Sequence, residues 1–146
     1  MILQAQPEDI DAIAALEKQI FSDAMTAGLL SSSMDRNLFF VAKDGESVLG
    51  YFLGTYVLDE MEVLRIAVSP ERRGQGYGRA LLNVAKKAAV ALGITRCFLE
   101  VRESNAVAIA LYRSMGFTPC GRRVRFYRQP DEDAILMQAQ WDKENE

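Results

Sequence analysis

Apolar residues recur at helical spacing in three stretches of the chain. Ile10, Ile13, Leu16 and Ile20 follow Pro7, a residue that favours the first turn of a helix, and they predict a helix up to about residue 20. The same period over residues 77–92 and 105–115 predicts two further helices. A weaker pattern over residues 25–34 indicates a short helix between the first of these and the strands that follow.

Segments rich in β-branched and aromatic residues alternate with these helices. Residues 38–42 and 48–58 flank Asp44-Gly45, a pair suited to a tight turn, so we expect an antiparallel hairpin continued by a strand over residues 63–68. A glycine-rich turn, a helix and a strand at 96–101 follow, an order typical of a crossover between parallel strands. Strands near 117–127 and 134–141 would complete a mixed, mostly antiparallel sheet with helices on both faces, an α/β (α+β) fold.

Composition fits one ordinary globular domain. The 146 residues are 49% hydrophobic and 25% charged, with no repeat and no linker, so we expect a domain over residues 1–141 and a flexible tail over 142–146. No apolar run approaches the roughly 18 residues of a membrane span. The first residues lack the pattern of a secretory signal, and we expect a cytoplasmic protein.

Charge and residue usage exclude several kinds of chemistry. Seventeen basic against twenty acidic residues give a net charge of -3, the wrong sign for coating nucleic acid or anionic lipid. The chain has no histidine, and Cys97 and Cys120 fit no metal-ligand spacing, so we expect no metal site. Catalysis would have to use carboxylates, phenols, backbone dipoles or a bound coenzyme.

The turn Arg72-Arg73-Gly74-Gln75-Gly76-Tyr77-Gly78-Arg79 joins a strand to a helix. Helix N-termini present unpaired amides, alternate glycines let a ligand approach the main chain, and arginines add charge, so this turn predicts an anion site suited to a diphosphate. It matches neither a Walker loop nor the dinucleotide pattern, because no Gly-Lys-Ser/Thr follows and Arg79 replaces the third glycine. The alternative is a flexible solvated turn.

Two further residues are candidates for catalysis. Glu100 interrupts a largely apolar strand, where a carboxylate is costly unless it is used or paired, for example with Arg65 or Arg96. Tyr112 lies two turns after Asn105 on one face of the following helix, where both could address a ligand, although Tyr112 could equally be a packing aromatic. Glu62, expected to face the same way as Leu64 and Ile66, is a rival carboxylate, and the arginines at 122–128 are expected to be solvated rather than to bind RNA.

These motifs resemble the GNAT superfamily of acetyl-CoA-dependent N-acetyltransferases over nearly the whole chain. Residues 73–78 are similar to its R/Q-x-x-G-x-G/A pyrophosphate loop, and residues 105–117 to its N-x-x-A-x-x-L-Y-x-x-x-G-F segment. Segments such as Leu99-Glu100-Val101-Arg102 and Phe126-Tyr127 resemble the bacterial RimI type, which acetylates the N-terminal alanine of a ribosomal protein. Residues 20–26 lack the Pro-Trp pair associated with that type.

The resemblance implies a fold and a set of roles. It implies a GNAT-like sheet with one splayed parallel strand pair, no metal, and acetyl-CoA as cosubstrate. Glu100 matches the general base of the family and Tyr112 its general acid, while the Val68 amide would polarise the thioester carbonyl. The pantetheine arm would pair with residues 66–68, the diphosphate would lie on residues 73–79, and Asn105 would contact the arm; the binding residues are therefore Ile66, Ala67, Val68, Arg73, Gly74, Gln75, Gly76, Tyr77, Gly78, Arg79 and Asn105.

Three alternatives to an N-terminal alanine acetyltransferase stay open from the sequence. The acceptor could be a polyamine, an antibiotic amine or a free amino acid instead of a ribosomal protein. The chain could be a noncatalytic acyl-CoA sensor. It could also be an RNA-associated module that uses its C-terminal arginines, which the net negative charge disfavours.

Overall fold

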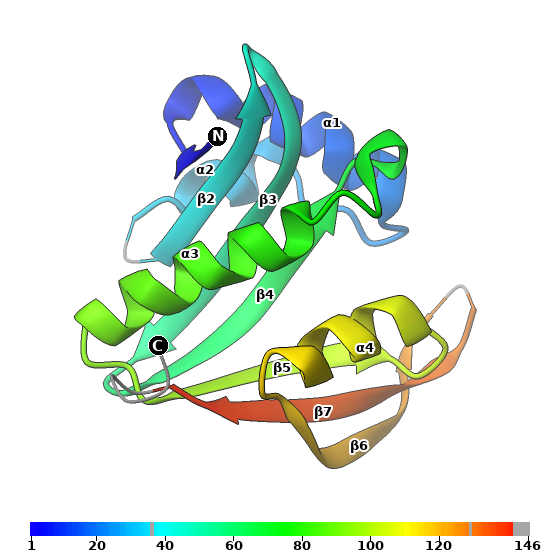
Figure 1. The fold of residues 1–146 in the computed structure, drawn as a ribbon. Coiled ribbons are helices and arrows are strands. Elements are labelled where there is room, and N and C mark those ends of the chain that lie inside the picture. The colour runs from blue at the N-terminus through cyan, green and yellow to red at the C-terminus, as the bar shows by residue number, and fades with distance from the viewer. Residues whose placement is uncertain (36, 129, 142–146) are drawn as a thin grey trace.

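The computed structural model of the protein describes residues 1–35, 37–128 and 130–141. In these ranges one sheet of seven strands, in the order β1-β2-β3-β4-β5-β7-β6, is flanked by four α-helices (Figure 1). The strands are β1 (Ile2–Gln4), β2 (Asn37–Asp44), β3 (Ser47–Val57), β4 (Glu60–Val68), β5 (Arg96–Arg102), β6 (Thr118–Tyr127) and β7 (Glu132–Gln140). The helices are α1 (Ile10–Ile20), α2 (Ala27–Ser32), α3 (Tyr77–Ala91) and α4 (Ala106–Ser114), with single 3-10 turns at Pro7–Asp9 and Pro70–Arg72.

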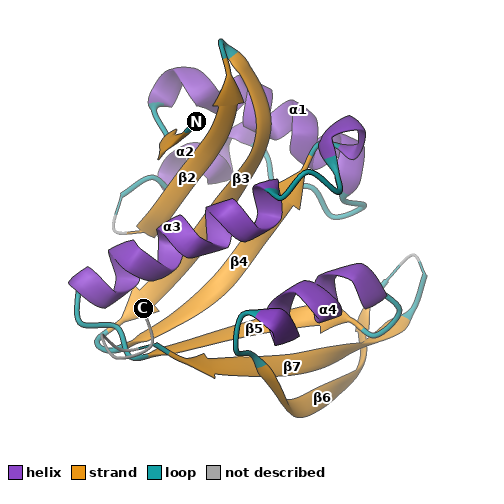
Figure 2. Cartoon of the chain, in the orientation of Figure 1, coloured by secondary structure: helices purple, strands orange, loops and turns teal. Residues whose placement is uncertain are grey.

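The helices cover both faces of the sheet, as predicted (Figure 2). On one face, Ile13 and Leu16 of α1 and Leu30 of α2 form a core with strands β2 and β3. On the other face, a larger core is built under α3 and α4 from residues such as Leu81 and Phe117. Burial of these two apolar faces from water drives the layered packing. No helix of the described residues is long and apolar enough to cross a membrane.

The parallel strand pair separates soon after it begins. β4 and β5 pair over only three registers, Glu60 with Arg96, Met61 with Cys97 and Glu62 with Phe98, whereas every other neighbouring pair is antiparallel. Beyond Glu62 the two strands diverge, and α3 and α4 lie on the same face of the sheet, α3 over the β4 side of the opening and α4 over the β5 side (Figure 1). The splayed pair implied by the resemblance is therefore confirmed, and the side of β4 that faces β5 has no strand partner from residue 63 onward.

A β-bulge changes which way β4 presents its side chains. Leu53 of β3 pairs with Arg65 but Gly54 pairs with Val63, so Leu64 is the extra residue. Val63 belongs to the core under α3, whereas Ala67 belongs to the core under α1. The prediction that Glu62 and Ile66 share a face is wrong for this reason, because the extra residue reverses the alternation between them.

Two helix boundaries differ from prediction, each because of a specific cap. Thr26 accepts a hydrogen bond from the Leu29 amide and starts α2 later than expected, at Ala27. Asn105 caps α4, which therefore starts at Ala106, and the Asn105 side-chain oxygen accepts a bond from the Ala108 amide at 3.1 Å. The expected tail, 142–146, lies outside the described residues.

Candidate active site

The glycine-rich turn lies at the start of α3, directly after β4. Gly74 and Gly76 have φ angles of +78° and +86°, a left-handed conformation that side chains with a Cβ rarely adopt, and Gly76 is the N-cap residue of α3. The cap has no side chain to accept hydrogen bonds from the first amides of the helix, so these amides stay available to an anionic ligand.

Charged and polar side chains surround the turn at which the sequence predicts an anion site. Arg73, Gln75 and Arg79 are exposed, while Tyr77 and Gly78 are half-buried. The Arg73 Nε donates to the Val68 carbonyl oxygen at 3.3 Å, and the Arg79 Nη2 donates to Ser114 Oγ at 2.8 Å. Two cations and the N-terminus of a 15-residue helix thus meet at one place, which fits a diphosphate group.

The segment Ile66, Ala67 and Val68 lies in the opening between β4 and β5. These residues pair with Phe52, Tyr51 and Gly50 of β3, and their other edge has no strand partner because β5 has already turned away. An extended amide-containing chain could therefore hydrogen-bond to this edge as an added strand would. The residues present fit the pantetheine arm of a coenzyme A thioester.

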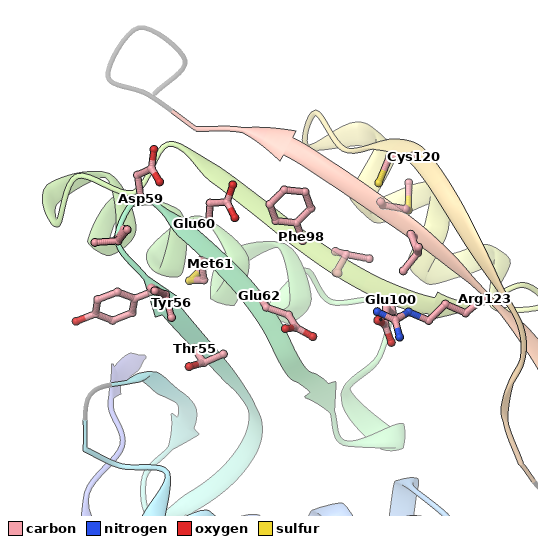
Figure 3. Close-up of a pocket in the computed structure, with 15 residues that line it drawn as sticks. Thr55, Tyr56, Asp59, Glu60, Met61, Glu62, Phe98, Glu100, Cys120 and Arg123 are labelled. Atoms are coloured by element: carbon pink, nitrogen blue, oxygen red, sulfur yellow. Dashed lines mark ion pairs between the residues drawn. The ribbon is translucent and has the colours of Figure 1, made fainter.

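Glu100 lies on β5 just beyond the last register of the parallel pair. Its side chain is 19% exposed, and the Arg123 Nε of β6 lies 3.1 Å from its Oε1 (Figure 3). Burial raises the pKa of Glu100, Arg123 opposes that shift, and the nearby carboxylate of Glu62 adds to it. An ion pair was an open alternative for this residue, but its partner is neither Arg65 nor Arg96, which pair with Glu17 and Glu60.

Tyr112 and Asn105 reach the opening from α4. Tyr112 is 7% exposed, its ring packs at 5.7 Å from that of Phe117, and burial raises the pKa of its hydroxyl. Ile66, Glu100, Asn105 and Tyr112 line one cavity, which we call the central cleft. Since capping occupies only the side-chain oxygen of Asn105, its NH₂ group can donate to a ligand there.

Glu100 is the residue at which three adjoining cavities meet. It lines the central cleft, a second cavity bordered by Asp23, Glu62 and Tyr127, and a groove bordered by Glu62, Phe98 and Arg123 (Figure 3). A carboxylate so placed can take a proton from a molecule that enters from the side opposite the glycine-rich turn. No group of His, Cys, Asp and Glu side chains within the described ranges could hold a metal, and Cys97 and Cys120 are free.

Sequence reasoning gave no role to Tyr127, which the structure brings into the site. It lines both the central cleft and the adjoining cavity, and the guanidinium of Arg102 lies 4.5 Å from the centre of its ring. Burial, followed by the charge of Glu100, raises its pKa to about 12. The sequence carried no signal for this placement beyond the aromatic pair at 126–127, because it depends on how β7 pairs with β5 and how β6 pairs with β7 at the edge of the sheet.

Known proteins resemble this chain in sequence and structure. The model of the acetyltransferase (GNAT) family matches residues 7–117. The [ribosomal protein bS18]-alanine N-acetyltransferase of Escherichia coli K12 is 39% identical over 109 residues, 73% of this chain and 74% of that protein. The uncharacterized protein ML0378 of Mycobacterium leprae is 38% identical over 139 residues, 90% of this chain, and the match spans only 38% of that longer protein.

The fold agrees with these matches. The crystal structure of the ribosomal-protein-S18-alanine N-acetyltransferase from Escherichia coli superposes with a TM-score of 0.90 at 32% identity, covering 97% of this chain and 94% of that one. The glycine-rich turn, the splayed strands and the order of elements in this chain agree with these matches. The chain belongs to the GNAT family of acetyltransferases and is an N-acetyltransferase that uses acetyl-CoA.

Proposed function

We propose that this enzyme acetylates the N-terminal α-amine of a ribosomal protein that begins with alanine. The support is the likeness to the bS18-alanine N-acetyltransferase of Escherichia coli, at 39% sequence identity. The observation that carries the proposal is the convergence of Glu100 from β5 and Tyr112 from α4 on the central cleft, beside the open edge of β4. A ribosomal protein as acceptor implies that the reaction takes place in the cytoplasm.

The proposed binding of acetyl-CoA uses two neighbouring sites, the N-terminus of α3 and the open edge of β4. The diphosphate lies on the first amides of α3 with Arg73 and Arg79, and the pantetheine arm pairs with residues 66–68 and the NH₂ group of Asn105. The Arg73 guanidinium leaves the Val68 carbonyl oxygen when it turns toward the diphosphate. The Val68 amide then polarises the thioester carbonyl.

The proton transfers are assigned to Glu100 and Tyr112. The amine nitrogen attacks the thioester carbonyl carbon, a C–N bond forms and the C–S bond breaks. Glu100 accepts the proton that the amine loses, directly or through water, and burial makes it a stronger base than an exposed glutamate. Tyr112 stays protonated because burial raises its pKa, and its hydroxyl donates a proton to the departing thiolate.

The proposed acceptor suits a single carboxylate base. An α-amine with a pKa near 7.8 is about one quarter neutral at pH 7.4, whereas a lysine with a pKa near 10.4 is about 0.1% neutral, a difference of roughly 3 kcal/mol. A lysine acceptor would need a site that lowers its pKa strongly. An N-terminal amine needs only positioning and the loss of one proton.

Mass spectrometry of a panel of amines tests the proposal. The panel contains an alanine-initiated ribosomal peptide, the same peptide with a blocked N-terminus and an internal lysine, a polyamine, an antibiotic amine and free alanine. We expect acetylation of the first peptide at its α-amine and little of the blocked one. Preferred acetylation of a small amine would replace the ribosomal acceptor, and tight acetyl-CoA binding without any transfer would indicate a sensor.

A further inference from the structure

The loop between α1 and α2 is held in place by bonds from two neighbouring elements. The Met25 amide donates to Glu17 Oε2 at 2.9 Å. The Arg65 Nη2 donates to the Asp23 carbonyl oxygen at 3.0 Å and to its carboxylate at 3.3 Å, and the Arg65 guanidinium lies 4.2 Å from the centre of the Phe21 ring. Three of the five residues 21–25 are therefore fixed from outside the loop.

These contacts originate in a buried carboxylate. Glu17 of α1 is fully buried, and its Oε1 accepts hydrogen bonds from the Tyr51 hydroxyl and from Arg65 Nε, the latter at 3.0 Å. Burying a charge in this way contributes little to stability compared with an apolar residue of the same size, but it fixes the geometry of the groups that satisfy it. Tyr51, Arg65 and Met25 are those groups, from β3, β4 and the loop.

The bulge in β4 is what allows Arg65 to reach the loop. Leu64 is the extra residue, and it turns Arg65 to the face of the sheet that α1 covers. The next residues, 66–68, form the open edge proposed to receive the coenzyme arm. One short segment of β4 therefore holds the loop on one side and borders the coenzyme site directly after it.

The loop forms a wall of the cavities in which the acceptor would react. Phe21, Ser22 and Asp23 line the central cleft together with Glu100 and Tyr127. Ser22 and Asp23 also line the adjoining cavity with Glu100 and Glu62. The distance between this wall and Glu100 limits the space beside a reacting amine.

We propose that Arg65 is a positioning residue that sets acceptor selectivity by fixing residues 21–25 against Glu17. Arg65 acts through the loop and not on the reacting atoms. The proposal rests on the function proposed above, because it assumes that the acceptor amine enters between this loop and Glu100. With the loop fixed, a small first residue such as alanine fits beside Glu100 and a larger one meets the wall.

The variant Arg65→Lys tests this inference with little change in charge. Lysine can keep an ion pair with Glu17, but it has no planar fork to bind the Asp23 oxygens at the same time. The matched control is Arg96→Lys, a β5 arginine whose ion pair with Glu60, at 3.9 Å, lies outside the central cleft. Both variants are compared with the unaltered enzyme in acetylation of peptides that differ only in a first residue of alanine or leucine.

We expect Arg65→Lys to lower the ratio of kcat/KM for the alanine peptide over the leucine peptide by about fivefold or more, mainly through KM, as expected from loss of a charged hydrogen bond. The dissociation constant of acetyl-CoA should stay within about twofold, since its proposed binding groups are untouched. The control should change neither quantity. An unchanged peptide ratio in Arg65→Lys would overturn the proposal.

Limited proteolysis tests whether Arg65 holds residues 21–25 in place, independently of any activity. Chymotrypsin cleavage after Phe21, mapped by mass spectrometry below the unfolding temperature, should accelerate about tenfold in Arg65→Lys and not in Arg96→Lys, because local opening depends on the lost bonds. If Arg65→Lys fails to fold, Asp23→Ala, which removes only the 3.3 Å bond to a 76% exposed carboxylate, should accelerate the same cleavage to a smaller extent. Equal cleavage rates in the unaltered enzyme and in the tested variant, Arg65→Lys or Asp23→Ala, would refute the inference that Arg65 holds this loop.

The two proposals fail in different ways. If the unaltered enzyme acetylates no N-terminal peptide, the proposed function is wrong, while the proteolysis result still decides whether Arg65 holds the loop. If the unaltered enzyme acetylates the alanine peptide, but the peptide ratio and the cleavage rate are both the same in Arg65→Lys, the proposed function stands. The inference about Arg65 is then wrong.

Discussion

We expect the ion pair between Arg123 and Glu100 to influence the pH dependence of the acetylation rate. Arg123 lowers the pKa of Glu100 against the larger opposing effect of burial. Replacing Arg123 with methionine keeps an unbranched apolar stem and removes the guanidinium charge. The pKa of Glu100 should then rise further, and because a general base must be deprotonated, the acidic limb of the rate profile should move to higher pH.

The size of this shift follows from the exposure of the pair. Two unit charges about 4 Å apart interact by about 1 to 4 kcal/mol as the effective dielectric constant falls from 80 to 20. Arg123 is 57% exposed and Glu100 19%, so solvent screening reduces the effect to about 0.5 to 1 kcal/mol. At a fixed pH on the acidic limb, kcat/KM of Arg123→Met should therefore fall by about two- to fivefold relative to unaltered enzyme.

The assay is kcat/KM for the preferred acceptor across the acidic limb, in unaltered enzyme, Arg123→Met and Arg128→Met. Arg128 follows the same strand, but it lies 4.0 Å from Asp131 instead of pairing with Glu100, so its removal should shift the limb less. Added salt should reduce the difference between unaltered enzyme and Arg123→Met, because it screens an exposed pair. A limb that stays in place or moves to lower pH in Arg123→Met would refute the assignment of Glu100 as the base.

Three further predictions concern the acid, the glycine turn and the buried network. Tyr112→Phe should lower kcat by about 100-fold or more while acetyl-CoA binding, measured by calorimetry, stays the same; an unchanged kcat removes Tyr112 from the acid role. Gly76→Ala should weaken acetyl-CoA binding by about five- to tenfold, since φ of +86° costs an alanine about 1 kcal/mol, whereas Gly93→Ala, at the same φ, should lower stability without changing affinity. Tyr51→Phe removes a hydrogen bond from buried Glu17 and should lower the free energy of unfolding in urea by about 1 to 3 kcal/mol; equal stability would contradict a stabilising role for the bond between Tyr51 and Glu17.

Local sequence signals predicted the order of elements well. The alternation of strands, the glycine turn and the helical periods depend on neighbouring residues, and the structure places β4, α3, β5 and α4 close to the expected positions. The same signals identified Glu100, Asn105 and Tyr112 as candidate residues for catalysis or ligand binding. Their convergence on one cleft depends on the crossover from β4 to β5, which the order of elements also predicted.

Features that depend on long-range geometry could not be predicted in this way. The bulge at Leu64 reverses which side chains of β4 face each side of the sheet. The sequence of β4 does not predict this bulge, because it arises in the pairing with β3. The partner of Glu100 was expected on strands near it, yet Arg123 comes from β6, 23 positions later in the chain. The Glu17–Arg65 pair joins α1 to β4 on the face of the sheet that α1 covers, and only the folded chain brings these residues together.

The proposed acceptor and the role of Glu100 are tested together by site-resolved mass spectrometry of an alanine-initiated ribosomal peptide, after incubation with acetyl-CoA and either unaltered enzyme, Glu62→Gln or Glu100→Gln. We expect one acetyl group on the α-amine with the first two enzymes and a large loss of product with Glu100→Gln. An acetyl group on a lysine side chain would refute the proposed acceptor, and full activity in Glu100→Gln would refute the role of Glu100 as the base.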